Sequence, residues 1–319
     1  MKTRLLLLAS ATILFSACAQ DDATLLGEVR DTLPAAAEVR VDVPSTDNKS
    51  TLGAVAEFYQ HTRNTSDFLN GASVVWVGII QTIMRYPATS VEGDTITWGP
   101  WNDDSALRPF AYKLVAVRTG DHAITYTLSG KRRSDAGEFI PLISGAAERP
   151  SAGARGKGTL ALLFDNQALL DVAKVERGTI TINYDLTGEP RTNAITFDDF
   201  VNERREGPRD SAYAYLLRAD GSGRFDFLTV ANVDNDGAGA LENLHIVSNW
   251  DATGAGRSDV AASGGNLGTV VWDVAQCWDA AFLATFTSYA ATGGSQPLLA
   301  NEGDEATCAV ASETVSAVE

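Results

Sequence analysis

The feature that most constrains the fold of this chain is a long stretch in which apolar and polar residues alternate. From Thr95 the apolar period is two residues, and it continues for about two hundred residues with Gly, Asp and Asn at regular breaks. Short strands joined by such turns form an antiparallel meander, and a meander this long closes or curves strongly. The sequence therefore predicts a mainly β domain over residues 91–319: a large curved antiparallel sheet of about a dozen strands, half-barrel or barrel-like in shape. The expected strands are 95–98, 112–117, 123–128, 139–143, 159–164, 179–184, 193–197, 212–217, 225–230, 244–247, 269–272 and 282–289.

A helical segment over residues 51–90 precedes these strands. Apolar residues recur at helical spacing over 52–59 and again over 68–83. Between the two runs, the sequence Asn-Thr-Ser-Asp at 64–67 offers N-cap residues for a second helix, which Pro87 ends. The apolar face of this second helix is wide. We therefore expect an N-terminal helical pair packed on the sheet, with the second helix filling the concave face.

The first residues have the form of a bacterial secretory signal peptide over residues 1–17. A basic start is followed by an apolar run and by two small residues directly before Cys18. The run Leu-Phe-Ser-Ala-Cys at 14–18 resembles the lipobox of bacterial lipoproteins. This resemblance implies that Cys18 becomes the new N-terminus, is diacylated on sulfur and usually receives a further acyl chain such as palmitate on its amine. The alternative, a plain cleaved signal with an incidental cysteine, stays open.

Residues 18–50 are expected to be the lipidated cysteine and a flexible tether, because this segment is polar, contains proline and shows little periodicity. Ala19 stands where some bacteria use Asp to retain a lipoprotein in the inner membrane. The expected location is therefore the bacterial cell envelope, lipid-anchored, with the outer membrane favoured and with either its periplasmic or its surface face possible.

The charge of the chain restricts its partners. Removal of Lys2 and Arg4 with the signal changes the net charge from −16 to −18. So acidic a protein has no basic stripe for phosphates, which argues against nucleic acid as a partner. Anionic head groups would repel it as well, so the acyl chains on Cys18 must hold it on the membrane. An envelope protein or an apolar ligand remains a possible partner.

Two cysteines, Cys277 and Cys308, remain once Cys18 is assigned to lipid. Two cysteines in an exported protein suggest one disulfide, and glycines between them allow the chain to fold back. A catalytic or redox pair is the weaker alternative, because there is no C-x-x-C spacing and no nearby histidine.

A possible calcium site lies at Asn232, Asp234 and Asp236, where oxygen side chains alternate and are followed by Gly237. The twelfth position of the corresponding EF-hand register is Asn243 and not Glu, which argues against a true EF-hand. The competing interpretation is an ordinary turn between two strands, because Asp, Asn and Gly favour turn geometry by themselves.

A further pattern combines the Asp- and Gly-rich run at 234–239, the motif W-x-x-x-G-x-G-R-x-D at 250–259 and the motif C-W-x-x-x-F at 277–282. It resembles the C-terminal half of uncharacterised bacterial lipoproteins, a resemblance that implies no activity. Arg257 is expected to pair with an aspartate and fix a turn, with Trp250 and Trp278 beside the disulfide. The tryptophans are either core residues or an aromatic platform for a sugar or other ligand.

We predict no catalytic residues. The three histidines are far apart in the sequence, and HExxH, GxSxG and phosphate-loop motifs are missing. Three classes of function stay open. The first is a non-enzymatic envelope lipoprotein with a structural or binding role, the second is a carrier of an apolar ligand or lipid in the cavity of the curved sheet, and the third is a hydrolase that uses two carboxylates.

Overall fold

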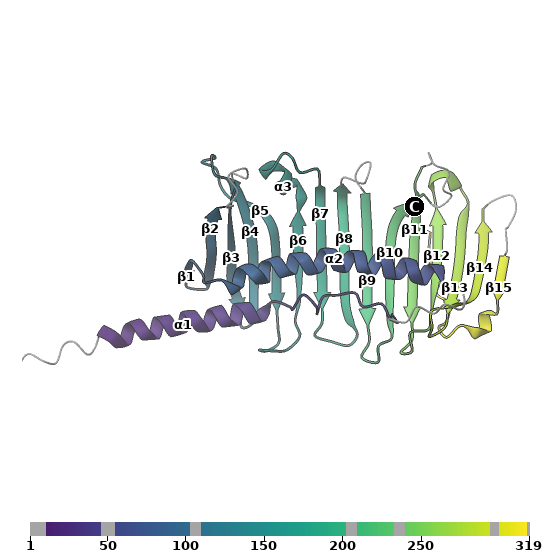
Figure 1. Cartoon of the computed structure of the whole chain (residues 1–319), viewed down its shortest axis with the longest axis horizontal. Coiled ribbons are helices and arrows are strands. Elements are labelled where there is room, and N and C mark those ends of the chain that lie inside the picture. The colour runs from purple at the N-terminus through teal and green to yellow at the C-terminus, as the bar shows by residue number, and fades with distance from the viewer. Residues whose placement is uncertain are drawn as a thin grey trace, which may run out of the picture.

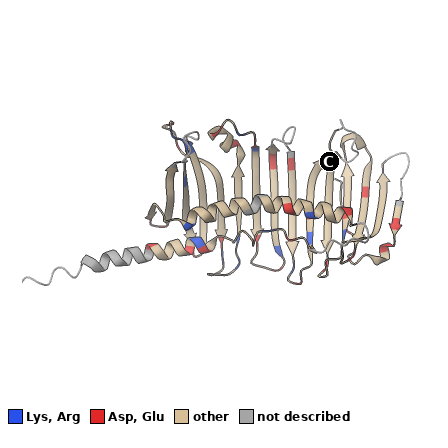
Figure 2. Cartoon of the chain, viewed as in Figure 1, with Lys and Arg blue, Asp and Glu red and all other residues tan. Residues whose placement is uncertain are grey.

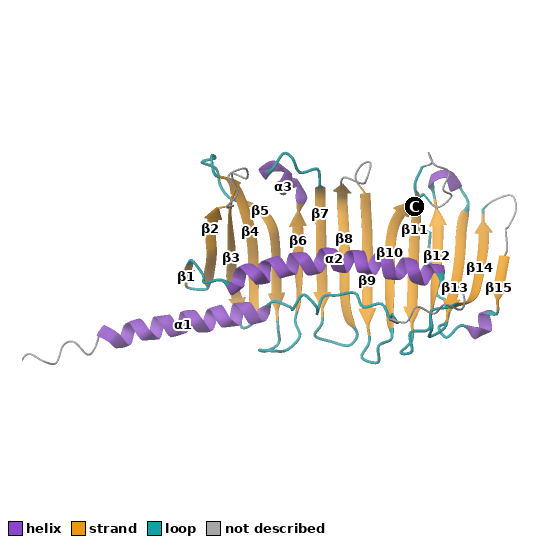
Figure 3. Cartoon of the chain, in the orientation of Figure 1, coloured by secondary structure: helices purple, strands orange, loops and turns teal. Residues whose placement is uncertain are grey.

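The computed structural model describes residues 11–45, 55–102, 110–201, 209–232, 240–293 and 300–317, and it has a single large β-sheet (Figure 1). Fifteen antiparallel strands within the described residues pair in chain order from β1 to β15, and the sheet does not close on itself. The predicted mainly β fold is thus confirmed, as an open sheet with helices on one side (Figure 3). The strands are β1 Ser90–Glu92, β2 Thr95–Asn102, β3 Phe110–Gly120, β4 Ala123–Arg132, β5 Ile140–Glu148, β6 Lys157–Leu163, β7 Arg177–Asp185, β8 Arg191–Val201, β9 Arg209–Leu217, β10 Gly223–Ala231, β11 Glu242–Trp250, β12 Gly256–Ser263, β13 Val271–Trp278, β14 Ala284–Thr292 and β15 Ala300–Gly303.

Three strands and the helices α1 (Ala11–Thr32) and α3 (Phe164–Leu170) had not been expected from the sequence. The two edge strands, β1 and β15, have three and four residues, which is too short for a visible alternation. Strand β12 is buried at every position, and its inner face carries Ser258, which bonds to Ser248, so apolar and polar residues do not alternate regularly along it. The short helix α3 follows β6 directly, where the sequence had suggested a strand ending at Phe164 and no element after it.

Helix α2 (Glu57–Arg85) is one continuous helix and not the expected pair. The polar residues that had suggested a new N-cap bond within the helix instead. Ser66 Oγ, within the run 64–67, donates to the carbonyl of Arg63 (2.8 Å), and Thr62 Oγ1, just before the run, donates to that of Phe58 (2.7 Å). Hydrogen bonds to carbonyls three or four residues earlier are an alternative to capping for such side chains. The helix therefore passes through this polar run without a break.

Helix α2 crosses the strands along most of the width of the sheet, from the β13 end to the β2 end (Figure 1). At 29 residues it is about 43 Å long. By length and composition alone it would qualify as a membrane-spanning helix. However, Leu69, Val77, Ile80 and Met84 are buried in the main core with the side chains of the inner sheet face. The expectation that this helix packs against the concave face is confirmed.

The expected tether differs from the structure where it is described. Helix α1 (Ala11–Thr32) places Leu25 and Val29 in the main core. The following segment, residues 33–45, runs along the sheet beside α2, and we call it the strap (Figure 1). Its Val39 and Val41 are almost fully buried. A flexible tether over 18–50 is therefore wrong for the part from Leu25 to the strap, because apolar side chains spaced along a polar sequence anchor it.

The strap lies in the core without joining the sheet, and side chains replace the missing ladder bonds. Asn70 of α2 bonds both to the amide of Val41 (2.7 Å) and to its carbonyl (2.8 Å). Asn193 donates to the carbonyl of Val39 (2.7 Å), and the Tyr215 hydroxyl contacts the amide and carbonyl of Asp42 (both 3.1 Å). Buried backbone groups need such partners. Helix, strap and sheet are thus joined by directional bonds as well as by apolar packing.

We predict that Leu69→Ala lowers the free energy of unfolding by about 2–5 kcal/mol, because it opens a cavity between α2 and the sheet. Phe68→Ala is the matched control. Its side chain is 56% exposed, whereas that of Leu69 is 1% exposed, and surface changes usually stay within about 0.5 kcal/mol. Urea denaturation followed by circular dichroism measures both. Equal losses in the two variants would contradict the packing of α2.

Candidate functional site

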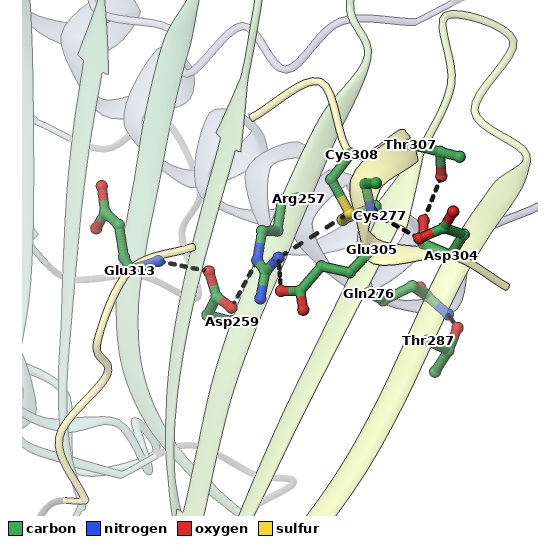
Figure 4. The surroundings of a disulfide bond; sticks show 11 residues. Arg257, Asp259, Gln276, Cys277, Thr287, Asp304, Glu305, Thr307, Cys308 and Glu313 are labelled. Carbon is green, nitrogen blue, oxygen red and sulfur yellow. Dashed lines mark hydrogen bonds and ion pairs between the residues drawn. A yellow bond between two sulfur atoms is a disulfide. The ribbon is translucent and has the colours of Figure 1, made fainter. Parts of the chain in front are cut away.

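The predicted disulfide is present and fixes the C-terminal segment to the outer face of the sheet (Figure 4). Cys277 of β13 and Cys308 have Cα atoms 5.5 Å apart. Cys277 is fully buried. Beyond the disulfide, the amide of Glu313 donates to Asp259 (3.0 Å), and the carbonyl of Ser316 lies 3.0 Å from Nδ1 of His245. Residues 308–316 therefore lie across the outward side of β11–β13.

A buried ion pair lies beside this disulfide. Arg257 Nε donates to Asp259 (2.8 Å), and its Nη1 donates to Glu305 (2.7 Å). Burial acts to lower the pKa of Arg257, but its bonds to Glu305 and Asp259 outweigh that effect and raise it. The predicted pairing of Arg257 with an aspartate is correct. The two residues lie on β12, however, and not in a turn.

The motif around Arg257 occurs twice, a signal that the sequence reading had missed. G-x-G-R-x-D is found at 221–226 and again at 254–259. In the first copy Arg224 pairs with Asp226 (2.8 Å), and Asp226 also lies 2.9 Å from Nε2 of His245. Arg224 also reaches Glu313 (3.2 Å). Both copies thus supply polar groups that hold the C-terminal segment.

The tryptophans of the pattern are core residues. Trp250 lies directly opposite Gly223, and Trp278 lies opposite Gly256. Each indole covers its glycine so closely that a Cβ there would overlap the ring. Trp250 and Trp278 are 3% and 2% exposed, so neither offers a platform to a ligand. Trp278 packs with Tyr59 of α2, on the face opposite the disulfide.

The predicted calcium loop is only partly visible. Asn232 follows β10, whereas Asp234 and Asp236 lie outside the described residues. Glu242, at the end of this loop, is buried and its carboxylate accepts the amide of Asn266 (3.0 Å). No cluster of three His, Cys, Asp or Glu that could hold a metal ion occurs among the described residues. The calcium site stays a prediction.

A polar cavity of about 340 Å³ lies between the C-terminal segment and strands β12–β14. Asp259 and Asp273 both line it, together with Arg257 and Glu313. Their strand register makes the two aspartates diagonal neighbours on the outer face. Burial raises the pKa of Asp273. Asp259, in contrast, uses one oxygen for Arg257 and the other for the amide of Glu313.

An apolar cavity of about 420 Å³ lies on the inner side of the sheet, near the β2 end of α2. Helix α2, strands β3–β5 and the segment containing α3 form its walls. The sequence reading had missed this cavity and α3, although Phe164 and Ala168 have helical spacing and good helix formers follow them. The apolar lining residues are Trp76, Ile79, Phe110, Tyr112, Leu128, Leu142, Ile143 and Leu170.

Comparisons with protein-family models, with curated proteins and with solved structures found no match to this chain. The backbone of Cys18, the predicted lipidation site, lies in α1, and its side chain lies outside the described residues. Cys18 is seven residues before Leu25, the first described side chain in the main core.

We predict that Cys308→Ser lowers the free energy of unfolding by about 3–4 kcal/mol, the loop-entropy value for a separation of 31 residues. The loss should appear first in the C-terminal segment, whose remaining contacts are polar and mostly exposed. Hydrogen exchange of residues 308–316 measures it, with Ser316→Ala as a control that leaves the backbone contact to His245. If the exchange of residues 308–316 is unchanged after loss of the disulfide, the disulfide does not hold this segment on the sheet.

Proposed function

We propose that this protein is a membrane-anchored lipoprotein of the bacterial cell envelope with a non-enzymatic structural or binding role. The observation that carries the proposal is the short distance between the lipobox-like cysteine and the folded body. Helix α1 is continuous from Ala11 to Thr32, so the seven residues from Cys18 to Leu25 span about 10 Å. An acylated Cys18 would hold the body directly at the bilayer surface.

Helix α1 is joined firmly to the body, so an anchor at Cys18 would also orient it. Arg30 donates to the carbonyls of Met84 (2.5 Å) and Tyr86 (3.0 Å) at the end of α2. Glu28 accepts the amide of His122 (2.9 Å) and pairs with Arg118 (3.3 Å). The helix then projects beyond the β1 edge of the sheet (Figure 1). The β1 end is therefore the end nearest the proposed membrane.

The charge of the chain is distributed in agreement with this orientation (Figure 2). Residues 85–157, which form β1–β5 and the start of β6, carry ten Lys or Arg and eight Asp or Glu. Residues 225–319, which form β11–β15 and nearly all of β10, carry one Arg and thirteen Asp or Glu. Anionic head groups repel the acidic end. With strands about 4.8 Å apart, the sheet would extend about 65–70 Å away from the membrane.

The filled concave face limits the carrier alternative. Side chains of α2 and the strap occupy the inner face of the sheet along most of its width, so a ligand groove along the whole sheet would require α2 to leave. A local cavity beside α3 remains.

The proposal predicts that Cys18→Ser abolishes acylation and leaves an unprocessed precursor, because the thiol is the acyl acceptor. Cells fed an alkyne analogue of palmitate should label the wild type at its N-terminal peptide. Cys308→Ser is the matched control and should keep the label. Detergent, and not high salt, should release the wild type from membranes, since its net charge disfavours electrostatic binding. A cleaved chain without label would contradict the lipid anchor and indicate a plain secretory signal.

A carboxylate-based hydrolase is a second candidate, favoured by the polar cavity under the C-terminal segment. Two aspartates there are diagonal neighbours, about 7–8 Å apart at Cα, and burial raises the pKa of Asp273. A raised pKa suits a general acid, and glycosidases use carboxyl pairs about 5–9.5 Å apart. Against it, both oxygens of Asp259 already accept hydrogen bonds.

If this candidate is right, Asp273→Asn should reduce hydrolysis of a glycoside panel at least about a hundredfold, because the general acid is lost. Asp198→Asn, at an exposed position on β8, should leave turnover unchanged. Turnover that survives Asp273→Asn would exclude this site.

A further inference from the structure

The apolar cavity beside α3 has the form of a binding site. Its lining is mainly aliphatic and aromatic, and its volume of about 420 Å³ is at the lower end of the range for small-molecule sites, about 300–1,000 Å³. The absence of a side chain at Gly130 of β4 leaves space for three lining residues. Leu142, Leu170 and Tyr112 all approach the place where a Cβ would be. The size suits one acyl chain better than the two chains of a phospholipid.

One polar group in the cavity wall is not satisfied within the described part of the chain. Gln167 of α3 lines the cavity, and its side-chain nitrogen Nε2 is buried without a hydrogen-bond partner. Leaving a buried N–H group without an acceptor destabilises the protein, because the group has lost its bonds to water. An acceptor on a bound molecule would supply the partner that this lining residue lacks.

Exposed apolar side chains gather at the mouth of this cavity. Leu169, Val172 and Val175 are 70%, 79% and 44% exposed, and they alternate along the chain with the lining residues Leu170 and Lys174. The segment is held in place, because Arg132 donates to the carbonyl of Leu170 (2.9 Å). Trp76 of α2 also contacts Phe164 of α3 edge to face, with centroids 6.4 Å apart. An apolar rim on a fixed segment would cover the outer part of an apolar ligand.

Charges of both signs lie at the mouth of the cavity. Asp171, Lys174 and Glu176 line it, and Arg132 and Arg177 bond to the carbonyls of Leu170, Lys174 and Glu176. These charges nearly balance, so no cluster of one sign favours a charged head group, and an uncharged head group costs less to take out of water.

We propose that this cavity binds the acyl chain of a neutral single-chain amphiphile, such as a monoacyl ester, with Gln167 donating a hydrogen bond to the ester oxygen. The inference names a ligand class for the binding role proposed above. It does not depend on acylation of Cys18.

The test uses the full mature chain, purified in an amphipathic polymer from membranes or, if Cys18 is not acylated, from the soluble fraction. The probe is a monoacylglycerol that carries a photoreactive diazirine and an alkyne. Crosslinks are mapped by peptide mass spectrometry, with unlabelled monoacylglycerol, palmitate and hexadecane as competitors.

Ile79→Trp fills the cavity, and Ile83→Trp is the matched control. Both isoleucines are half-buried on α2, one turn apart, but Ile79 lines the cavity and Ile83 does not. Gln167→Leu removes the donor with little change of volume. Thermal melts confirm that each variant is folded.

We expect crosslinks concentrated on peptides containing Trp76, Leu142 and Leu170, reduced at least about tenfold by Ile79→Trp and less than about twofold by Ile83→Trp. Monoacylglycerol should compete about tenfold better than hexadecane in the wild type, and this preference should disappear in Gln167→Leu. Crosslinks spread over the whole surface, or undiminished by a folded Ile79→Trp variant, would overturn the proposal. Better competition by palmitate would overturn the neutral head group. Because the probe is added after purification, failure of Cys18 acylation would leave these results unchanged.

Discussion

The inner face of an open fifteen-stranded sheet must be covered, and the rest of this structure depends on how that is done. A barrel would cover its inner face by closing, but this sheet leaves a long apolar surface that α2 and the strap occupy. The paired bonds between Asn70 and the backbone of Val41 join these two elements to each other. Loss of the strap would expose apolar side chains and leave the buried polar groups that now bind it without hydrogen-bond partners. Cover and sheet therefore form one folded body.

This constraint also explains which parts of the fold the sequence could predict. Most strands were predicted because their inner side chains face the covered core and their outer ones face solvent, which gives a period of two. The strap was not predicted, because the partners of its backbone, Asn70, Asn193 and Tyr215, are far away in the sequence and only the fold brings them close. Strand β12 was missed for a different reason, since its inner face carries Gly256 and Ser258 in place of large apolar residues, and the sequence there does not alternate.

The candidate sites divide in the same way. The disulfide followed from counting cysteines, because one pairing was left once Cys18 had been assigned to lipid. The expectation that the tryptophans lie beside the disulfide puts them on the wrong face of the sheet. Only the strand register shows that Trp278 faces α2, whereas its neighbour Cys277 faces outward. The apolar cavity could not have been predicted, because Ile79, Leu142 and Gln167 come from three elements that meet only in the folded chain. Local patterns thus predicted the disulfide better than they predicted binding sites, and the lipidation of Cys18 stays a prediction.

The claim that the strap belongs to the folded body is tested most directly by hydrogen exchange on the mature protein. The amides of Val41 and Asp42, which donate to Asn70 and Tyr215, should exchange as slowly as amides in the central strands. When denaturant is added, the exchange of these two amides should become faster at the same denaturant concentration as that of the α2 amides. Exchange of these two amides at the rate of an unfolded chain, with the sheet still protected, would show that the segment is a tether and would contradict the account.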